Sequence, residues 1–494
     1  MKRIDFSRFG SLLLVFLTGC AVGPDYRQPA AGLPEAYSLS SGGGASGAAS
    51  AVVSGAHVLR EWWTLFQDEE LNGLVARAHT HNFDLQMAIA RVDEAEGLAR
   101  EAGSAFFPRL DLGAASSRNK VGAVSAIPLP AATSRFRDSR QAALSASYEI
   151  DLWGKIRRAS EAATADLLST TYARDTVGLS VAGYVSNAYI ALRAADASLA
   201  LMRGTLESRE QALEIVKSRL AAGNASPLDL HQAESSLAAA QAQMAELRRQ
   251  RALAENQLAL LTGQPGLTVK PDDLRRLPVP PVPPAGLPSG LIESRPDIRQ
   301  AEEALIAANA RIGVAKAALF PSLSLTGSAG SESAALVKLF SAPAEVWSIS
   351  AALAMPIFDA GRNFARIDQA TARQRQALAN YLKSVQTAFK EVNDALSGLR
   401  ENSEGDQAQS TRAQAAEKTL ELAQRRYEAG YSPFLEVLDA QRSANDANLA
   451  FISVRQARLN SIIDLFKALG GGWKDGFKTA PVAPAENAAE LNKN

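Results

Sequence analysis

The side chains that most often carry catalysis or hold metals are few and scattered in this 494-residue chain. His79 and His81 stand two residues apart in a helical sequence pattern, which points their rings to different faces. His57 and His231 have no ligand partner at metal spacing. Serines are abundant, but no nucleophile-elbow sequence surrounds any of them. The sequence therefore predicts no metal site, no cofactor and no enzymatic activity.

The chain's only cysteine, Cys20, follows a basic amino end and a short apolar run. The run from Leu12 to Leu17 is too short to span a membrane as a helix, and three basic residues precede it. This combination is typical of a secretory signal peptide. The closing tetrapeptide LTGC resembles the lipobox of bacterial lipoproteins, so we expect diacylglycerol and an N-acyl chain on Cys20. Ala21 follows it, as in lipoproteins that are sent to the outer membrane.

Two acids, Glu436 and Asp439, form a third candidate for chemistry. Their spacing puts both carboxylates on one face of a helix. If copies of the chain surround an axis, each acid becomes a ring, and carboxylate rings favour cations in a narrow pore. The alternative is a solvated acidic helix face, and the residues alone leave both interpretations open.

The charge balance and composition exclude some classes of protein. The formal net charge is zero, and removal of residues 1–19 takes away three bases and one acid, which leaves about −2. This balance gives no support to nucleic-acid binding. With no second cysteine, a disulfide within the chain is excluded. After Cys20 no uninterrupted apolar run reaches 18 residues, so the chain can cross a membrane only as strands.

The elements that must position these residues occur twice. FFPRLDLGAAS at 106–116 pairs with LFPSLSLTGSA at 319–329, an offset of 213 residues. From Gly154 against Gly361 onward the offset is 207 and persists to the end of each half. The sequence therefore predicts two similar halves of about 200 residues in series.

Each half is predicted to contain one helix, two strands and then two very long helices. Residues 155–222 contain no proline and only three glycines, and residues 363–429 are similar, so each stretch is expected to form one helix. At 1.5 Å per residue such a helix is on the order of 100 Å long. A second helix follows a turn near Gly223 or Gly430, which predicts an antiparallel helical hairpin in each half.

The second helix of each half carries a heptad seam, with seam residues at alternating spacings of three and four. Arginine takes the seventh place of both seams. The many alanines allow backbones to approach closely, so we expect the hairpins to pack sideways. The seams are Leu230, Ala233, Leu237, Ala240, Met244, Leu247, Arg251, Ala254, Leu258 and Leu261, and Val437, Ala440, Ala444, Ala447, Phe451, Val454, Arg458, Ser461, Leu465 and Ala468.

The strand regions lie between residues 108 and 153 and between residues 321 and 358. In the first, Leu110 and Leu112 alternate with polar or small residues, and the second region alternates in the same way. Segments 144–152 and 346–357 are expected to be the returning strands. Four strands are too few to close a barrel, since membrane barrels start at about eight. Three copies of the chain would give twelve strands and a lumen, whereas two copies would give a barrel filled by its own side chains.

Four stretches carry a likeness to a known family: CAVGPDYRQP at 20–29, YEIDLWGK at 148–155, RPDIRQAEEALIAANARIGVAKAALFPSLSL at 295–325 and RYEAGYSPFLEVLDAQR at 426–442. The chain resembles the TolC-like outer-membrane factor family, in its OprM-like lipoprotein branch, whose members serve tripartite multidrug efflux systems. The resemblance covers nearly the whole mature chain.

The resemblance implies an α+β membrane protein, a homotrimeric α/β-barrel. Its shared twelve-stranded transmembrane β-barrel would continue into a periplasmic barrel of long antiparallel coiled-coil helices. It implies two partners, a periplasmic adaptor and a proton-driven inner-membrane transporter of the RND type. The chain would then be a passive duct for drugs in the bacterial outer membrane, held in outer-membrane lipid, with its tunnel in the periplasm.

The resemblance also implies roles for particular residues. It places the periplasmic gate at Glu436 and Asp439. The 207-residue offset extends this role to Asp229, whereas the counterpart of Asp439 is Gln232. The hairpin turns are expected to dock the adaptor through Gly223, Pro227, Gly430 and Pro433.

The expected organisation has six parts. A small-residue tract at 38–55 is typical of a flexible linker, and eight prolines mark the connector between the halves. The parts are a signal peptide (1–19), a lipid-anchored segment and linker (20–60), the first repeat (61–263), a Pro-rich connector (264–290), the second repeat (291–472) and a tail (473–494).

Two other functions remain open at this point. With the same fold, the chain would serve as the exit duct of a type I protein secretion system, although the lipobox and the RPDIRQAE stretch favour drug efflux. In a different class, it would be a lipid-anchored periplasmic coiled coil without a pore, against which the alternating strands argue.

Overall fold

The computed structural model describes residues 21–30, 32, 34, 37, 61–122, 124, 134–282 and 295–471. The signal peptide, Cys20, the small-residue tract and the carboxyl tail lie outside these residues. The chain divides into two compact units. One comprises Met1–Ala30, Val92–Thr170 and Ala301–Tyr381, and the other comprises Ala31–Arg91, Thr171–Gln300 and Leu382–Asn494.

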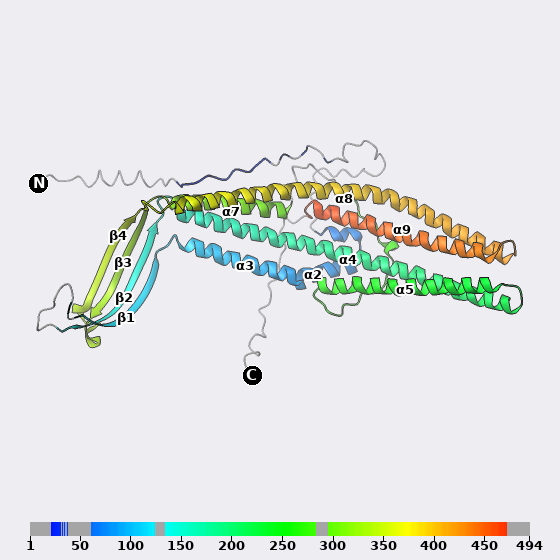
Figure 1. Ribbon diagram of the computed structural model, residues 1–494, viewed down its shortest axis with the longest axis horizontal. Coiled ribbons are helices and arrows are strands. Elements are labelled where there is room, and N and C mark those ends of the chain that lie inside the picture. Colours follow the sequence, from blue (N-terminus) through cyan, green and yellow to red (C-terminus); the bar gives the residue numbers. More distant parts are fainter. Residues whose placement is uncertain are drawn as a thin grey trace. The chain divides into compact units, whose positions relative to one another are not determined.

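The first unit contains a four-stranded antiparallel sheet in the order β1-β2-β3-β4 (Figure 1). Each half contributes two strands, as the repeat predicts. Two strands differ from the expected bounds. β2 begins before residue 144, because residues 136–143 pair with β1, and β4 ends before Pro356, which has no N–H to donate to a ladder. The strands are β1 (Arg109–Lys120), β2 (Phe136–Ile150), β3 (Ser322–Ser333) and β4 (Glu345–Ala354).

The register gives the sheet one apolar face and one polar face. Leu112 lies opposite Leu144, Leu144 opposite Ala329, and Ala329 opposite Trp347. Because side chains alternate along a strand, all large apolar residues of the strands except Val346 fall on that face. It carries Leu110, Leu112, Phe136, Leu144, Tyr148, Ile150, Leu323, Leu325, Trp347, Ile349 and Leu353. The other face carries many of the serines of the strands, and the alternation predicted from the sequence is confirmed.

Two helical hairpins, each with a helix of 67 and a helix of 35 residues, lie mostly in the second unit, and their 67-residue helices begin in the first unit. Gly223 and Gly430 end the long helices with positive φ angles of 74° and 79°. The amide of the next residue donates to the carbonyl of Arg219 or Arg426, which is the bond of a glycine C-cap. Both predicted turns are confirmed. The helices are α4 (Lys155–Ala221), α5 (Pro227–Leu261), α8 (Arg362–Glu428) and α9 (Phe434–Ala468).

Both heptad seams are confirmed, since every seam residue is buried or half-buried. The two hairpins also pack against each other. One core cluster combines Leu213 and Val216 of α4, Ala233 of α5, and Phe434 and Val437 of α9. This is the sideways packing that the alanine content predicts.

The remaining elements are helices of 3 to 22 residues. Among the described residues, no helix is both long enough and apolar enough to cross a membrane. The elements are η1 (Trp62–Phe66), α2 (Glu69–His81), α3 (Phe83–Ser104), η2 (Leu274–Arg276), α7 (Pro296–Ala317), η3 (Leu336–Lys338) and η4 (Ala342–Ala344).

Candidate functional site

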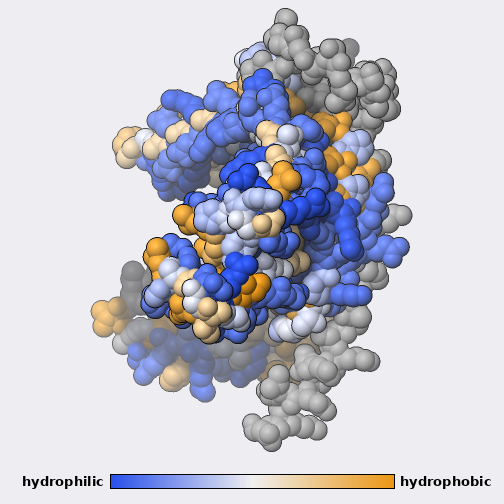
Figure 2. Space-filling model, turned by 90° about the vertical axis from the view of Figure 1, so that its right-hand side faces the viewer, coloured by the Kyte–Doolittle hydropathy of each residue, from blue (hydrophilic) through white to orange (hydrophobic). Residues whose placement is uncertain are grey.

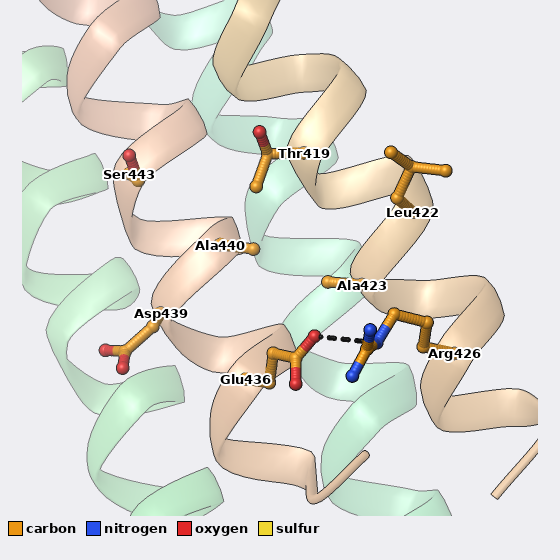
Figure 3. A pocket seen from close by; sticks show the side chains of 8 residues that line it. All are labelled: Thr419, Leu422, Ala423, Arg426, Glu436, Asp439, Ala440 and Ser443. Carbon is orange, nitrogen blue, oxygen red and sulfur yellow. Dashed lines mark ion pairs between the residues drawn. The ribbon is translucent and has the colours of Figure 1, made fainter. Parts of the chain in front are cut away.

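A hollow of about 420 Å³ lies between α8 and α9 near the turn of the second hairpin (Figure 3). It brings together both acids that the sequence analysis assigned to the gate. Arg426 faces Glu436 across the hollow. The lining residues are Thr419, Leu422, Ala423, Arg426, Glu436, Asp439, Ala440 and Ser443.

Glu436 pairs with Arg426, whose Nε lies 3.1 Å from Glu436 Oε1. Both side chains are about half exposed, at 41% and 58%. An ion pair this open to water contributes about 0–1 kcal/mol, so it is easily separated. The pair joins α8 and α9 of one hairpin.

Asp439 points away from Arg426 in Figure 3. Its carboxylate lies 3.3 Å from a guanidinium nitrogen of Arg442, one turn along the same helix. Both side chains are more than 60% exposed. In the single chain, the Asp439 carboxylate is therefore exposed to solvent.

Asp229 takes part in a capping box at the start of α5. Its Oδ2 accepts hydrogen bonds from the backbone N–H and from the hydroxyl of Ser226, both at 2.9 Å. The Ser226 hydroxyl accepts in turn from the Asp229 amide at 3.2 Å. These bonds, the one from the Ser226 backbone first, lower the pKa of Asp229. The S-x-x-D spacing is a readable sequence signal for this cap that our sequence analysis missed.

We predict that Ser226→Ala destabilises the start of α5 by about 1 kcal/mol, the usual effect of losing an N-cap. The lowered pKa of Asp229 means that the cap's contribution is present at neutral pH and is lost as the pH falls through that pKa. Hydrogen exchange of the first-turn amides measures the change. Ser235→Ala, on an exposed part of the same helix, is the control. Equal exchange in both variants at neutral pH would contradict the prediction.

Tyr427 was not predicted as a site residue, yet it links the two hairpins. Arg219 of α4 donates a hydrogen bond to its hydroxyl. The guanidinium carbon of Arg219 also lies 4.5 Å from the centroid of the Tyr427 ring, a cation–π distance. Arg219 thus bridges the two hairpins through an aromatic residue, whereas Arg426 pairs within its own hairpin.

The seam arginines have acidic partners on the preceding long helix. Arg251 Nε lies 2.7 Å from Asp196 Oδ1, and Arg458 Nη1 lies 2.7 Å from Asp406 Oδ2. The two acids are only 3% and 9% exposed. Each hairpin therefore contains a largely buried ion pair between its two helices.

Arginines in and near these ion pairs also donate hydrogen bonds to the connector (264–290). Arg251 donates to the carbonyl of Val269, Arg193 to that of Lys270, and Arg455 to that of Leu277, at 2.9, 2.5 and 3.0 Å. Residues of both halves thus bind the connector's main chain. The sequence shows only an irregular Pro-rich stretch here, because the donors lie far away along the chain.

The predicted docking residues all lie at the hairpin turns. Gly223 and Gly430 form the left-handed C-caps. Pro227 is the first residue of α5, where proline costs no helical hydrogen bond because an N–H at this position has no partner in the helix. Pro433 is the N-cap of α9. Cys20 lies outside the described residues.

Long repeated helical hairpins joined to strands with one apolar and one polar face define a class, the outer-membrane channel proteins. The family model described as "Outer membrane efflux protein" matches residues 74–264 and 287–471, and the chain belongs to this family. It is 35% identical over 464 residues to the cation efflux system protein CusC of Escherichia coli O6:H1 (93% of this chain, 97% of CusC). It is 36% identical over 472 residues to the solvent efflux pump outer membrane protein SrpC of Pseudomonas putida (95% and 99%).

Solved structures agree with this assignment. The Campylobacter jejuni CmeC outer membrane channel superposes with a TM-score of 0.83 at 27% identity, covering 92% of this chain and 95% of CmeC. The chain therefore has the fold of an outer-membrane efflux channel and acts in efflux at the outer membrane.

Proposed function

We propose that the chain is the exit duct of a tripartite efflux pump and that three copies form it. The observation that carries the proposal is the sheet. Among the described residues, β1 and β4 each pair with a strand on one side only. Exposed edge groups cost several kcal/mol each in lipid, so both edges need partners from further copies. Three copies bring twelve strands, whose apolar faces meet lipid and whose serine-rich faces line a water-filled lumen.

The duct passes small molecules, drugs among them, from an inner-membrane transporter of the RND type through a periplasmic adaptor. The relatives support small-molecule efflux, since CusC is named for cations and SrpC for solvents. A type I protein secretion duct is the alternative. Purification of crosslinked complexes distinguishes the two, because an RND transporter and its adaptor are expected in the first case only.

The gate of the duct is assigned to Glu436 and Asp439, with Asp229 as their first-half counterpart. The open pair of Glu436 with Arg426 supports this assignment, because weak contacts suit a mouth that opens when a partner binds. The adaptor would dock on the turns at Gly223, Pro227, Gly430 and Pro433. Figure 2 views the side on which these turns lie, and that side is mostly hydrophilic, with scattered hydrophobic atoms.

The lipid anchor is assigned to Cys20, carrying diacylglycerol and an N-acyl chain. The residues just after Cys20 support this assignment, since hydrogen bonds join them to the folded part of the chain. The Val22 amide donates to the Trp153 carbonyl at 3.0 Å, and Asn309 donates to the Pro24 carbonyl at 2.8 Å. Gly23 lies so close to Gly313 that a Cβ on Gly23 would come within 2.6 Å of the Gly313 Cα.

Conductance of the purified full chain in planar bilayers tests the duct and its gate. We expect Glu436→Ala with Asp439→Ala to raise the closed-state current and to lower the preference for cations, because both carboxylate rings are removed. The control is Glu210→Gln with Glu214→Gln, two exposed acids of α4. An unchanged current and an unchanged cation preference would exclude this gate. A wild-type protein that is a water-soluble monomer would exclude the duct.

A further inference from the structure

The end of the sheet that joins β1 to β2 and β3 to β4, called here the loop end, is strongly basic. Residues 116–140 and 331–345 contain six basic and three acidic side chains, a net charge of +3, whereas the whole chain has a net charge of zero. The basic residues are Arg118, Lys120, Arg135, Arg137, Arg140 and Lys338, and the acidic ones are Asp138, Glu332 and Glu345.

Three of these cations lie on the apolar face of the sheet. Arg118 and Lys120 are an even number of residues from Leu112, so they share its face. Arg140 lies opposite Ser116 and belongs to the same face. Asp138, opposite Arg118, and Glu345 of β4 lie on this face too, so these five side chains give the apolar face a net charge of +1 at the loop end.

Two of the cations converge on one aromatic ring. The Arg118 guanidinium carbon and the Lys120 Nζ lie 5.0 and 5.5 Å from the centroid of Phe136. One acid, Asp138, lies 3.4 Å from Arg118 Nε. Two cations drawn to one ring repel each other, so the arrangement favours a further anion between them.

Exposed large apolar residues flank Lys338 in the sequence, in the segment between β3 and β4. Leu336, Val337 and Phe340 are 67%, 93% and 83% exposed in η3 and the residues after it. Exposed apolar residues next to basic ones are typical of a segment that lies in the headgroup region of a membrane. Free phosphate would leave these apolar residues unexplained, whereas a lipid offers both an anionic headgroup and acyl chains.

We propose that Arg118, Lys120, Arg140 and Lys338, called here the basic rim, bind the phosphorylated headgroups of an anionic membrane lipid. This inference rests on the proposed function, which puts the loop end at the outer surface of the outer membrane. The ligand is a lipid that carries phosphates close to its acyl chains. Arg118 and Lys120 hold the phosphates, and the apolar residues around Lys338 contact the upper acyl region.

The test uses the full-length protein in detergent micelles and native mass spectrometry. The probe is a diphosphorylated glycolipid, compared with its phosphate-free form and with inorganic phosphate. A basic residue near an anionic surface strengthens binding by roughly fivefold. Arg118→Gln with Lys120→Gln is therefore expected to weaken binding of the phosphorylated lipid by roughly 30-fold. Arg109→Gln with Arg137→Gln removes the same charge from the polar face and is expected to leave binding unchanged.

Equal weakening by both double variants, or equal binding of the phosphate-free lipid, would overturn the proposal. It would also be overturned if inorganic phosphate displaced the lipid at equal concentration. Loss of the oligomeric state by the Arg118→Gln, Lys120→Gln variant would also overturn the proposal. It would mean that the cations pair with a second copy, whose Glu345 lies on the same face at the other edge of the sheet. If the proposed duct function is wrong, the wild-type protein will show no conductance. The lipid-binding measurement does not depend on that result.

Discussion

Asp196→Ala is expected to destabilise the protein by about 3–5 kcal/mol, since it removes a buried carboxylate and leaves Arg251 with Glu255 as its remaining counter-charge. The carboxylate also lies 3.7 Å from Arg193 and accepts a hydrogen bond from the Asp272 amide at 3.4 Å. One substitution therefore loosens α4, α5 and the connector together. Denaturant unfolding of the purified protein, followed by circular dichroism, measures the change.

Asp394→Ala is the control, because this acid is 60% exposed and pairs with its helix neighbour Lys390. It is expected to cost about 1 kcal/mol or less. A second variant, Asp196→Ala with Arg251→Met, is expected to recover part of the loss, since the Arg251 charge is removed together with its carboxylate, whereas Arg193 and Glu255 each lose one partner. Equal stability of the two single variants would refute the role of the buried pair.

Gly330→Val is expected to prevent correct pairing of β2 with β3 and so to reduce the yield of assembled protein severalfold. A Cβ at Gly330 would come within 2.2 Å of the Ala142 carbonyl oxygen and 2.5 Å of the Ala143 Cα, both of them backbone atoms. Overpacking of this kind costs about 1–3 kcal/mol, and more where the backbone must move. This pairing joins the strands of the two halves, so the sheet would be split in the middle.

Gly327→Val, three residues earlier on β3, is the matched control. A Cβ there meets only the Ser348 carbonyl oxygen, at an ordinary 3.7 Å. The fraction of protein that resists unfolding in mild detergent measures assembly. If the Gly330 and Gly327 variants assemble equally well, the close contact at Gly330 does not control strand pairing.

The sequence predicted the parts of the fold that depend on local periodicity. The heptad positions from Leu230 to Leu261 give the buried side of α5, and the glycine turns give the hairpin ends. Strand alternation around Leu110 and Leu112 gives the apolar face of the sheet. These features depend on repeating patterns that neighbouring residues share, so one chain is enough to read them.

The rest depends on partners that are distant in sequence. The acid opposite Arg251 lies 55 residues earlier, and no spacing rule connects them. The Arg219–Tyr427 contact joins residues 208 positions apart. The spacing of Glu436 and Asp439 marked them as candidates and the family resemblance gave them the gate role, but the separate directions of their carboxylates required coordinates. The Ser226 cap is different, since its signal was local and was overlooked.

The two buried ion pairs have an evolutionary consequence. Arg251 and Arg458 occupy matching places, but their acids do not, because the position that matches Asp196 is Ser403 and the position that matches Asp406 is Leu199. Each hairpin still contains both members of its own pair. A whole hairpin exchanged between relatives would therefore keep both members of its ion pair. A single exchanged helix could leave a buried charge without its partner. Recombination among such proteins should leave its breakpoints between hairpins, not inside them.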